Sequence, residues 1–434
     1  MVTLSELRTQ ISSLPKGNVY GKTINGKTYW YHQYFENGKR YCKLLQSDDV
    51  QKTIEQIKKR KALEEELSFL IRSKDVSLSK SMTQKTGYVM SKDDVVARFD
   101  HGELVFIDEK RCPLVINRTH RLEDFLRLRV VDGSRTHARL LKKALAISNL
   151  EDDAISLAAY SASISDAFWF KPLHSKLKYK DIAFSQNALF HLALEGDTAY
   201  FPFKLKQTPE LTSPGSFEKG WKRIGEAWWL YKKGSKAEIF SELLASFIAP
   251  LLGVPSALYE YDSPYIRSKN FADTMDFEPM AALCGDDDNY EFVWEKLSST
   301  YPEFISAYGR LMLFDALINN VDRHNQNYGF LRDRHHGKVV SLAPNFDCNL
   351  SLISGGPLNE NPAKDGLIRL FLTFAKSKKE IQDVFKSVSL PELKEEDFAK
   401  ASEKVPLELR PEYFDKLIHI LKIRYDYLRQ ALLV

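Results

Sequence analysis

The sequence has few cysteines and no long apolar run. Its four cysteines stand far apart among the 434 residues and form no CxxC pair. That spacing excludes a zinc ribbon and a disulfide framework, and it favours reduced thiols in a cytoplasmic protein. No window holds 18 consecutive apolar residues, so we expect no membrane span and no membrane partner. The first residues, MVTLSELRTQISS, are polar and lack the apolar core of a signal peptide.

The chain also lacks a large excess of charge of one sign. It has 62 Lys and Arg against 58 Asp and Glu, a net charge of +4, and 44% of its residues are hydrophobic. This composition is typical of a soluble globular protein with two or three domains, and by itself it makes no case for nucleic-acid binding. The charge is uneven, however. Residues 1–80 carry 15 Lys and Arg against 9 Asp and Glu, a balance of +6 that leaves −2 for the rest.

Residues 17–45 predict a small β-meander. Two segments rich in aromatic and β-branched residues flank Asn25-Gly26, a strong signal for a hairpin turn, and ENGKR makes a second turn. A helical pattern with an acidic start follows at 48–74. The polar stretch 75–87 after it predicts a linker.

Two interpretations of this basic, aromatic hairpin stay open. It could be a nucleic-acid surface, because aromatic rings stack on bases and Lys or Arg contacts phosphate. It could also be a solvated hairpin whose Tyr and Trp side chains pack on the helix behind it, and we favour this interpretation because strands favour aromatic residues in any case. The segment resembles small N-terminal modules of mobile-element proteins.

The rest of the chain changes from strand-rich to helix-rich. Beyond residue 290 most of it is predicted to be helical, apart from 328–355, and the aromatic stretch 163–172 is expected to pack onto the next domain. A β-rich lobe before an α-rich lobe implies a cleft between them, the usual place for a ligand. The predicted strands are 87–91, 102–108, 112–117, 199–205, 226–234, 257–262 and 271–280, and the predicted helices are 120–131, 134–147, 236–254, 378–388, 391–404 and 410–433.

The stretch 319–330, NNVDRHNQNYGF, combines many carboxylate, amide and imidazole groups directly after an apolar helical run. Four residues separate Asp322 from Asn327, which is the spacing of a protein-kinase catalytic loop. In that loop the Asp accepts the proton of the substrate hydroxyl and the Asn holds Mg²⁺. Asp347 follows about twenty residues later, after a short apolar run, where a carboxylate could be the second metal ligand. Such oxygen ligands suit Mg²⁺.

A Lys and a Glu upstream strengthen this hypothesis. Lys232 ends a predicted strand, and Glu242 lies ten residues later on an amphipathic helix. A strand Lys paired with a helix Glu is how kinases fix the ammonium group on the nucleotide phosphates. Lys233 and Glu238 compete for these two roles, but a strand alternates faces, so only one of the two lysines can point into the cleft. Gly215 and Gly220 lie before the strand in a polar loop that permits close approach of the backbone to phosphate.

Several other polar groups have alternative interpretations. Arg323 could pair with a phosphate or with a nearby carboxylate. His324 could bind a metal, but the sequence offers no HxxxH partner, and stabilisation of the catalytic loop is favoured. The stretch 285–289, GDDDN, could bind a cation or form a solvated loop, and we favour the loop. His335-His336 is expected to mark an exposed turn before a glycine.

Two stretches, FDALINNVDRHNQNYGFL and LAPNFDCNLSL, resemble the catalytic loop and metal motif of HipA-like serine/threonine kinases. SELLASFIAPLLGV resembles the helix that follows the phosphate-binding Lys of that family. The resemblance covers about residues 150–434 and leaves out the first 80. It implies an α+β, two-lobed, protein-kinase-like fold that uses ATP and Mg²⁺. The expected division is 1–80 as an accessory module, 81–160 as a connecting region, 161–285 as the N-lobe and 286–434 as the helical C-lobe.

The resemblance also assigns roles by matching position. Asp322 is the catalytic base, Asn327 and Asp347 complete the catalytic set and bind the metal, and Lys232 contacts phosphates with Glu242 as its partner. Members of the family can autophosphorylate in the loop that holds Ser213 and Ser216, although this loop departs from the commoner pattern. Residues 276–280 match the hinge that meets adenine. The other residues placed at the nucleotide are Gly215, Ser216, Phe217 and His324.

Three functions from different classes follow. The first is a kinase that transfers the γ-phosphoryl of ATP to a protein hydroxyl and phosphorylates itself. The second is a catalytically inactive nucleotide- or nucleic-acid-binding regulatory protein that uses residues 1–80. The third is a metal-dependent hydrolase built on Asp322, His324 and Asp347. The protein substrate and an antitoxin-like partner stay open, because one sequence does not reveal the grooves that read them.

Overall fold

The computed structural model describes most of the chain. The predicted strand 199–205 and most of the predicted helices 378–388 and 391–404 lie outside the described residues. The described ranges are 9–24, 26–36, 39–82, 85–145, 147, 150–197, 208–213, 215, 217–379, 381–382, 392, 394–397 and 411–433.

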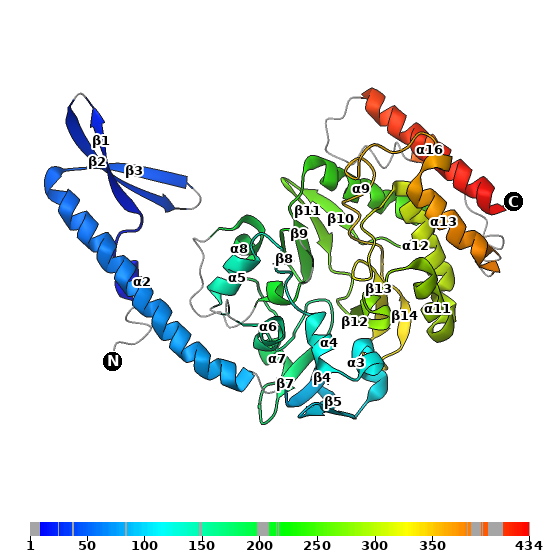
Figure 1. The fold of residues 1–434 in the computed structure, drawn as a ribbon, viewed down its shortest axis with the longest axis horizontal. Coiled ribbons are helices and arrows are strands. Elements are labelled where there is room, and N and C mark those ends of the chain that lie inside the picture. The colour runs from blue at the N-terminus through cyan, green and yellow to red at the C-terminus, as the bar shows by residue number, and fades with distance from the viewer. Residues whose placement is uncertain are drawn as a thin grey trace.

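The N-terminal module is a three-stranded antiparallel sheet followed by a long helix. The sheet contains β1 (Asn18–Ile24), β2 (Lys27–Glu36) and β3 (Lys39–Leu45) in that order, so the predicted meander is confirmed. The helix α2 (Ser47–Met82) has 36 residues, which corresponds to about 54 Å. The linker predicted for 75–87 is wrong over its first eight residues, because α2 continues through them and no Gly or Pro interrupts the chain before Gly87. Figure 1 shows the sheet at the end of α2 that lies away from the body of the molecule.

A four-stranded antiparallel sheet begins the body, in the order β6-β5-β4-β7. Its β7 lies in the aromatic stretch 163–172 and pairs with β4, so this sheet spans the expected boundary at residue 160. Val89, Phe99 and Phe170 from these strands are almost completely buried in the main core. The strands are β4 (Gly87–Ser91), β5 (Asp94–Asp100), β6 (Glu103–Phe106) and β7 (Phe168–Pro172).

The strand predicted for 112–117 is wrong, because this segment forms the helix α3 (Leu114–Thr119). Its β-branched residues favour a strand locally, but one local and one tertiary feature favour the helix. Pro113 precedes the first turn, and the buried Glu278 carboxylate accepts the backbone N–H of Leu114 at 2.7 Å. A carboxylate 164 residues away thus satisfies an N–H group that the helix itself leaves free.

Short helices connect this sheet to the next one. The predicted helices 120–131 and 134–147 are present but shorter than expected. The helices are α4 (Leu122–Arg127), α5 (Ala138–Ala144), α6 (Asp152–Ala158), α7 (Tyr179–Ile182) and α8 (Phe190–Glu195), with 3-10 turns at η1 (Glu109–Arg111) and η2 (Pro209–Thr212).

A second four-stranded antiparallel sheet, in the order β10-β11-β9-β8, forms the wall of the candidate site. The sequence predicts β9 and β10, whereas β8 and β11 are polar and were not expected. The helix α9 (Lys236–Leu251) follows β9 and starts with a capping box formed by Ser235 and Glu238. The strands are β8 (Lys219–Ile224), β9 (Ala227–Lys232), β10 (Tyr259–Asp262) and β11 (Tyr265–Lys269).

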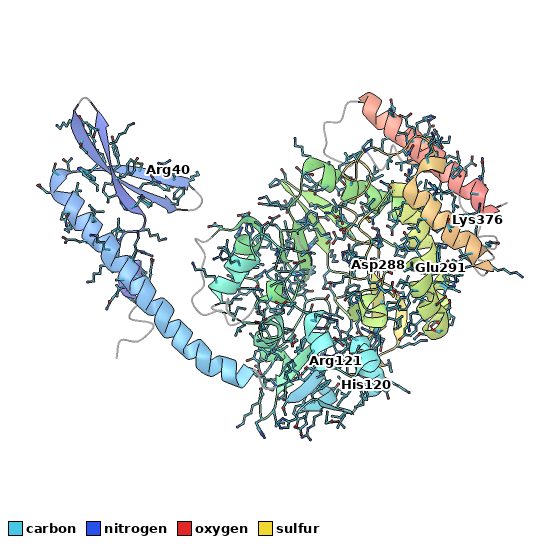
Figure 2. All side chains as sticks on the ribbon, viewed as in Figure 1. Arg40, His120, Arg121, Asp288, Glu291 and Lys376 are labelled. Atoms are coloured by element: carbon cyan, nitrogen blue, oxygen red, sulfur yellow. The ribbon has the colours of Figure 1, made fainter. Side chains whose placement is uncertain are left out.

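A three-stranded sheet, β12-β13-β14, joins this part to a helical lobe. Among the described residues beyond 290, most are helical outside the region around β13 and β14, as the sequence predicts. Asp288 and Glu291 lie around the start of α11 (Figure 2). The elements are β12 (Met275–Pro279), α10 (Ala281–Cys284), α11 (Tyr290–Thr300), η3 (Pro302–Phe304), α12 (Ile305–Ile318), β13 (Gly329–Asp333), β14 (Val339–Leu342), η4 (Pro362–Lys364), α13 (Gly366–Ser377) and α16 (Pro411–Leu433).

The C-terminal helix α16 is fixed to the lobe by a buried arginine. Arg424 forms an ion pair with Asp365 at 2.6 Å and donates to the carbonyl oxygens of Leu317 and Ala316 at 2.8 and 2.7 Å. Both carbonyls belong to the last turn of α12, which leads into the loop at 319–330. None of the helices in the described ranges combines the length and the apolar character that a membrane span needs.

We expect Arg424→Ala to lower the free energy of unfolding of this lobe by about 3–5 kcal/mol, because it leaves a buried carboxylate and two carbonyls without their donor. Urea unfolding followed by circular dichroism measures this change. The matched control is Lys416→Ala on the same helix, α16. It breaks only the exposed ion pair of Lys416 with Glu360 and should leave the midpoint unchanged. Equal midpoints for the two variants would contradict the anchoring role.

Candidate functional site

The site is organised around one buried lysine. Lys232 is the last residue of β9, is 6% exposed, and forms ion pairs with Asp347 at 2.7 Å and with Glu242 at 3.6 Å. Burial disfavours its charged form, but Asp347 and Glu242 outweigh this effect and raise the pKa of Lys232. The competing Lys233 is exposed, as strand alternation requires. The competing Glu238 belongs to the cap of α9, so of the two glutamates only Glu242 faces the lysine.

Asp347 is held by its backbone as well as by its carboxylate. Its N–H donates to Oε1 of Glu242 at 3.0 Å and to the hydroxyl of Tyr259 at 3.2 Å. Its φ of +61° is a left-handed conformation that few side chains adopt, which turns the carboxylate toward Lys232. Burial alone would raise its pKa, yet Lys232 and then Lys219 lower the pKa of Asp347 to about 2. The carboxylate is therefore ionised at neutral pH.

A second buried ion pair shapes the loop that follows α12. Arg323 forms a bidentate pair with Asp315 at 2.8 and 2.9 Å. The same guanidinium donates to the carbonyl oxygens of Asn327 and Phe346, at 2.8 and 3.1 Å. Of the two interpretations of Arg323, the structure therefore shows the carboxylate partner. Because it binds both the loop and the residue before Asp347, Arg323 fixes the two segments relative to each other.

The loop that Arg323 holds contains Asp322, His324 and Asn327. The amide nitrogen of Asn327 donates to the Asp322 carbonyl at 2.9 Å, so its oxygen is the atom left for a cation. Asp322 is only partly exposed, and burial raises its pKa, an effect that His324 opposes and Asp347 strengthens. The ring of His324 accepts the backbone N–H of Gln326 at 3.3 Å, which supports its expected role in stabilising the loop.

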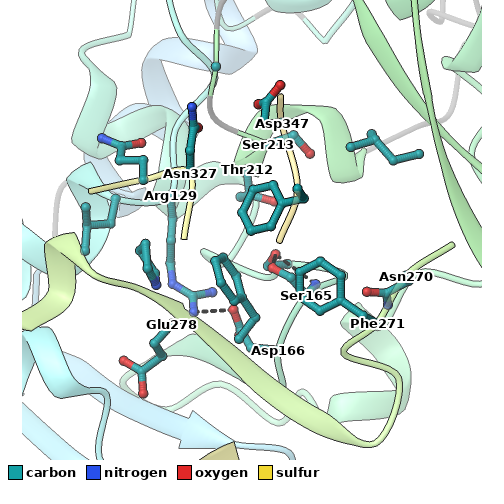
Figure 3. A pocket seen from close by; sticks show the side chains of 18 of the residues that line it. Arg129, Ser165, Asp166, Thr212, Ser213, Asn270, Phe271, Glu278, Asn327 and Asp347 are labelled. Atoms are coloured by element: carbon teal, nitrogen blue, oxygen red, sulfur yellow. Dashed lines mark hydrogen bonds and ion pairs between the residues drawn. The ribbon is translucent and has the colours of Figure 1, made fainter. Parts of the chain in front are cut away.

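A pocket lies against these groups (Figure 3). Lys232, Asp347, His324 and Asn327 line it, whereas Asp322 is not among its lining residues. Residues 277–279 of the expected hinge line it as well. Apolar and aromatic walls come from Leu128, Leu230, Phe271, Phe277 and Phe346. The pocket thus combines an apolar region with a charged end, as a nucleotide requires.

The expected phosphate-binding loop meets the charged end of the pocket. Ser213 and Gly215 line it, Phe217 is not among the lining residues, and Ser216 lies outside the described residues. Gly215 has a φ of +98°, which favours glycine, and a Cβ there would require Nζ of Lys219 to move. Burial lowers the pKa of Lys219 to about 8, an effect that Asp347 opposes and Lys232 strengthens. Lys219 was not predicted as a site residue, although it lies only four residues after Gly215 in the expected phosphate-binding loop.

A second buried ion pair in the pocket wall was also missed. Arg129 and Asp166 are joined at 2.6 Å, as the dashed line in Figure 3 shows, and Arg129 lies 4.4 Å from the ring of Phe125. Burial raises the pKa of Asp166 to about 6, and Arg129 limits that rise. The two residues lie 37 positions apart in segments of ordinary composition. No sequence pattern brings them together.

Two other predictions concern residues outside the pocket. In the stretch 285–289 the three Asp side chains are exposed, and Asn289 caps α11. Asn325 of the loop 319–330 donates to the carbonyls of Gly285 and Asp287, so the stretch 285–289 supports that loop through its backbone. His335 and His336 lie in an exposed turn before a glycine, as expected.

The oxygen donors of the site fit a hard cation. Within the described residues no group of three or more His, Cys, Asp and Glu side chains forms a ready metal cage. Asn327 and Asp347 supply one amide and one carboxylate oxygen instead. Mg²⁺ typically takes one or two protein carboxylates and fills its remaining positions with water and phosphate oxygens, so this sparse set suits it.

We expect the Asp347–Lys232 pair to make the free energy of unfolding depend on pH in the acid range. Because the pKa of Asp347 falls to about 2 from an ordinary 3.8, the unfolded chain binds more protons between these values, and stability drops as pH falls from about 5 to 2. The share of Asp347 is about 2 kcal/mol. Urea midpoints at several pH values should show a shallower acid slope for Asp347→Asn than for wild type, with the exposed Asp286→Asn as control. An unchanged slope would contradict the ion pair.

The comparisons with known proteins bear on the fold. No protein-family model and no curated protein matches the sequence. The chain is similar to HipA in the solved complex of Shewanella oneidensis MR-1 HipA, HipB and operator DNA, with a TM-score of 0.50 and 13% identity, over 80% of this chain and 99% of that one. It is also similar to the proinflammatory kinase CtkA of Helicobacter pylori, with a TM-score of 0.40 and 18% identity, over 50% and 92%. The likeness to HipA confirms the expected fold: the chain is α+β, two-lobed and kinase-like.

Proposed function

We propose that the chain is a HipA-like serine/threonine kinase that transfers the γ-phosphoryl group of ATP to a protein hydroxyl. The observation that carries the proposal is the contact of Lys232 with both Glu242 and Asp347 in the wall of a pocket that Asn327 also lines. Lys and Glu from the β-rich lobe and an Asp and Asn from the helical lobe are the parts that phosphoryl transfer needs. A structural ion pair alone would not explain their convergence on one pocket.

Each residue has a role that its surroundings support. Lys232 stays protonated and can hold phosphate oxygens, while Glu242 fixes its position. Lys219 and the backbone around Gly215 add positive charge and close approach at the same end of the pocket. Asn327 and Asp347 would hold Mg²⁺, which when bound neutralises charge on the phosphate oxygens.

Asp322 is proposed as the base. It would accept the proton of the substrate hydroxyl as the new O–P bond forms and the bond between the β- and γ-phosphates breaks, leaving ADP. Its raised pKa makes it a stronger base than an exposed carboxylate. Its position beside the pocket, rather than in its lining, leaves room for an incoming side chain.

Autophosphorylation is part of the proposal. Ser213 lines the charged end of the pocket, donates to the carbonyl of Pro209 at 2.8 Å and accepts from the indole of Trp221 at 2.9 Å.

The four cysteines are free thiols, as a cytoplasmic kinase would have. The solved HipA complex contains HipB, and by analogy we propose that this chain can have an antitoxin-like partner.

Asp322→Asn should reduce phosphoryl transfer at least 100-fold, because it removes the proton acceptor while preserving shape. ATP affinity should change less than about threefold, since the side chain does not line the pocket. The assay incubates pure protein with labelled ATP and Mg²⁺ and maps any phosphorylated residue. Asp286→Asn is the control. Wild-type transfer by Asp322→Asn would end the proposal, and ATP binding without transfer by the wild-type chain would support the inactive nucleotide-binding alternative.

Lys232→Ala should also reduce transfer by about 100-fold or more, because the cation that holds the nucleotide phosphates is lost. Its neighbour Lys233 is exposed, so Lys233→Ala should retain wild-type activity. Circular dichroism must accompany the assay, since the variant leaves Asp347 and Glu242 without their cation. Wild-type transfer by Lys232→Ala would show that Lys232 does not have this role.

A further inference from the structure

The two faces of the N-terminal sheet differ in what covers them. Successive strand residues point to opposite faces, and directly paired residues share a face, so the register assigns each side chain. On one face, His32 contacts the carbonyl of Lys16 at 2.6 Å. The same segment is joined to α2, because Arg60 donates to the carbonyls of Ile11 and Leu14, both at 2.7 Å. We call this the covered face because the N-terminal segment contacts it at His32, although Trp30 and Tyr41 on the same face are 39% and 40% exposed.

The opposite face, the open face, is basic and aromatic. Strands β1–β3 carry five Lys and Arg against a single acidic residue, Glu36. The register places Lys22, Lys27 and Arg40 on the open face. On the open face, Phe35 is 62% exposed and Leu44 is 50% exposed. Figure 2 shows Arg40 on this sheet, away from the body of the molecule. The residues of the open face that matter here are Tyr20, Lys22, Lys27, Tyr31, Phe35 and Arg40.

The aromatic rings of the open face already contact one another. Tyr20 and Tyr31 stack with centroids 5.6 Å apart and planes 24° apart, and Lys27 lies 5.8 Å from the ring of Tyr29. In this pair each ring covers one face of the other, whereas Phe35 on the same face of the sheet is 62% exposed. Tyr hydroxyls, Lys and Arg are common contacts to the phosphates of a duplex, whereas unpaired bases need free ring faces for stacking.

Protection of a sheet edge does not explain this charge. Lysines on edge strands can prevent pairing with other chains, and β1 and β3 are the two edges here. Lys27, however, belongs to the central strand β2, where it protects no edge. A face with three cations and no carboxylate among its described strand residues is complementary in charge to an acidic partner.

We propose that the open face binds the phosphate backbone of duplex DNA. A sheet of three strands at about 4.8 Å spacing is about 10 Å wide, close to the width of the major groove. The contacts named here are to phosphates, so they position the module without selecting a sequence. This binding rests on residues far from the pocket and does not depend on the proposed kinase activity.

The test measures fluorescence anisotropy of a labelled 20-base-pair duplex with the full chain between 50 and 200 mM salt. The triple substitution Lys22→Gln, Lys27→Gln, Arg40→Gln should weaken binding at least tenfold. It should also lower the slope of log affinity against log salt by about 2–3, since each lost phosphate contact removes about 0.9. The matched control, Lys39→Gln, Lys43→Gln, Lys52→Gln, removes the same charge from the covered face and α2 and should change affinity less than threefold.

Three outcomes would overturn the proposal. The first is no duplex binding at 50 mM salt by the wild-type chain. The second is equal weakening by the two triples, which would indicate a general charge effect rather than one face. The third is tighter binding of the single strand of the same sequence. Since all six substitutions are at exposed residues, thermal unfolding should show that both variants remain folded.

Discussion

The site depends on one buried cation that joins three segments. Lys232 ends β9, Glu242 lies on α9 and Asp347 follows β14, so the triad connects the β-rich lobe to the loop of the helical lobe. Two carboxylates at 2.7 and 3.6 Å keep the ammonium charged despite its burial. The cation in turn holds Asp347 ionised. Neither charge would be stable there alone, so each lobe supplies what the other requires.

Arg323 gives the second lobe a comparable rigidity. Its pair with Asp315 anchors the loop to α12, and its donation to Phe346 fixes the residue next to Asp347. Arg424 extends the same design by joining α16 to the carbonyls that end α12. Buried arginine side chains thus fix the end of α12 and the loop after it, where no helix or strand holds the backbone. Such positioning is most of what phosphoryl transfer asks of a protein.

The N-terminal module follows a different logic. It has no comparable buried ion network among its described residues, and Ile11 and Ile57 are its well-buried apolar residues. Three of its five strand cations lie on the open face, and Figure 1 shows the sheet at the end of α2 that lies away from the body of the molecule. A polyanion-binding surface and a phosphoryl-transfer site in one chain would allow its position on DNA and its chemistry to be set separately.

The sequence by itself determined the elements whose signals are local: the meander at Asn25-Gly26, the amphipathic α9 and the Asp322–Asn327 spacing. Strand alternation allowed only one of Lys232 and Lys233 to face the cleft, and the resemblance to HipA-like kinases selected Lys232. Only the tertiary structure decided the rest. Residues 112–117 became helical because Glu278 caps α3 from 164 positions away, and Lys219 and Arg129–Asp166 entered the pocket through contacts between distant segments. Periodicity and spacing record what a segment prefers alone, whereas burial and ion pairing depend on which segments the fold brings together.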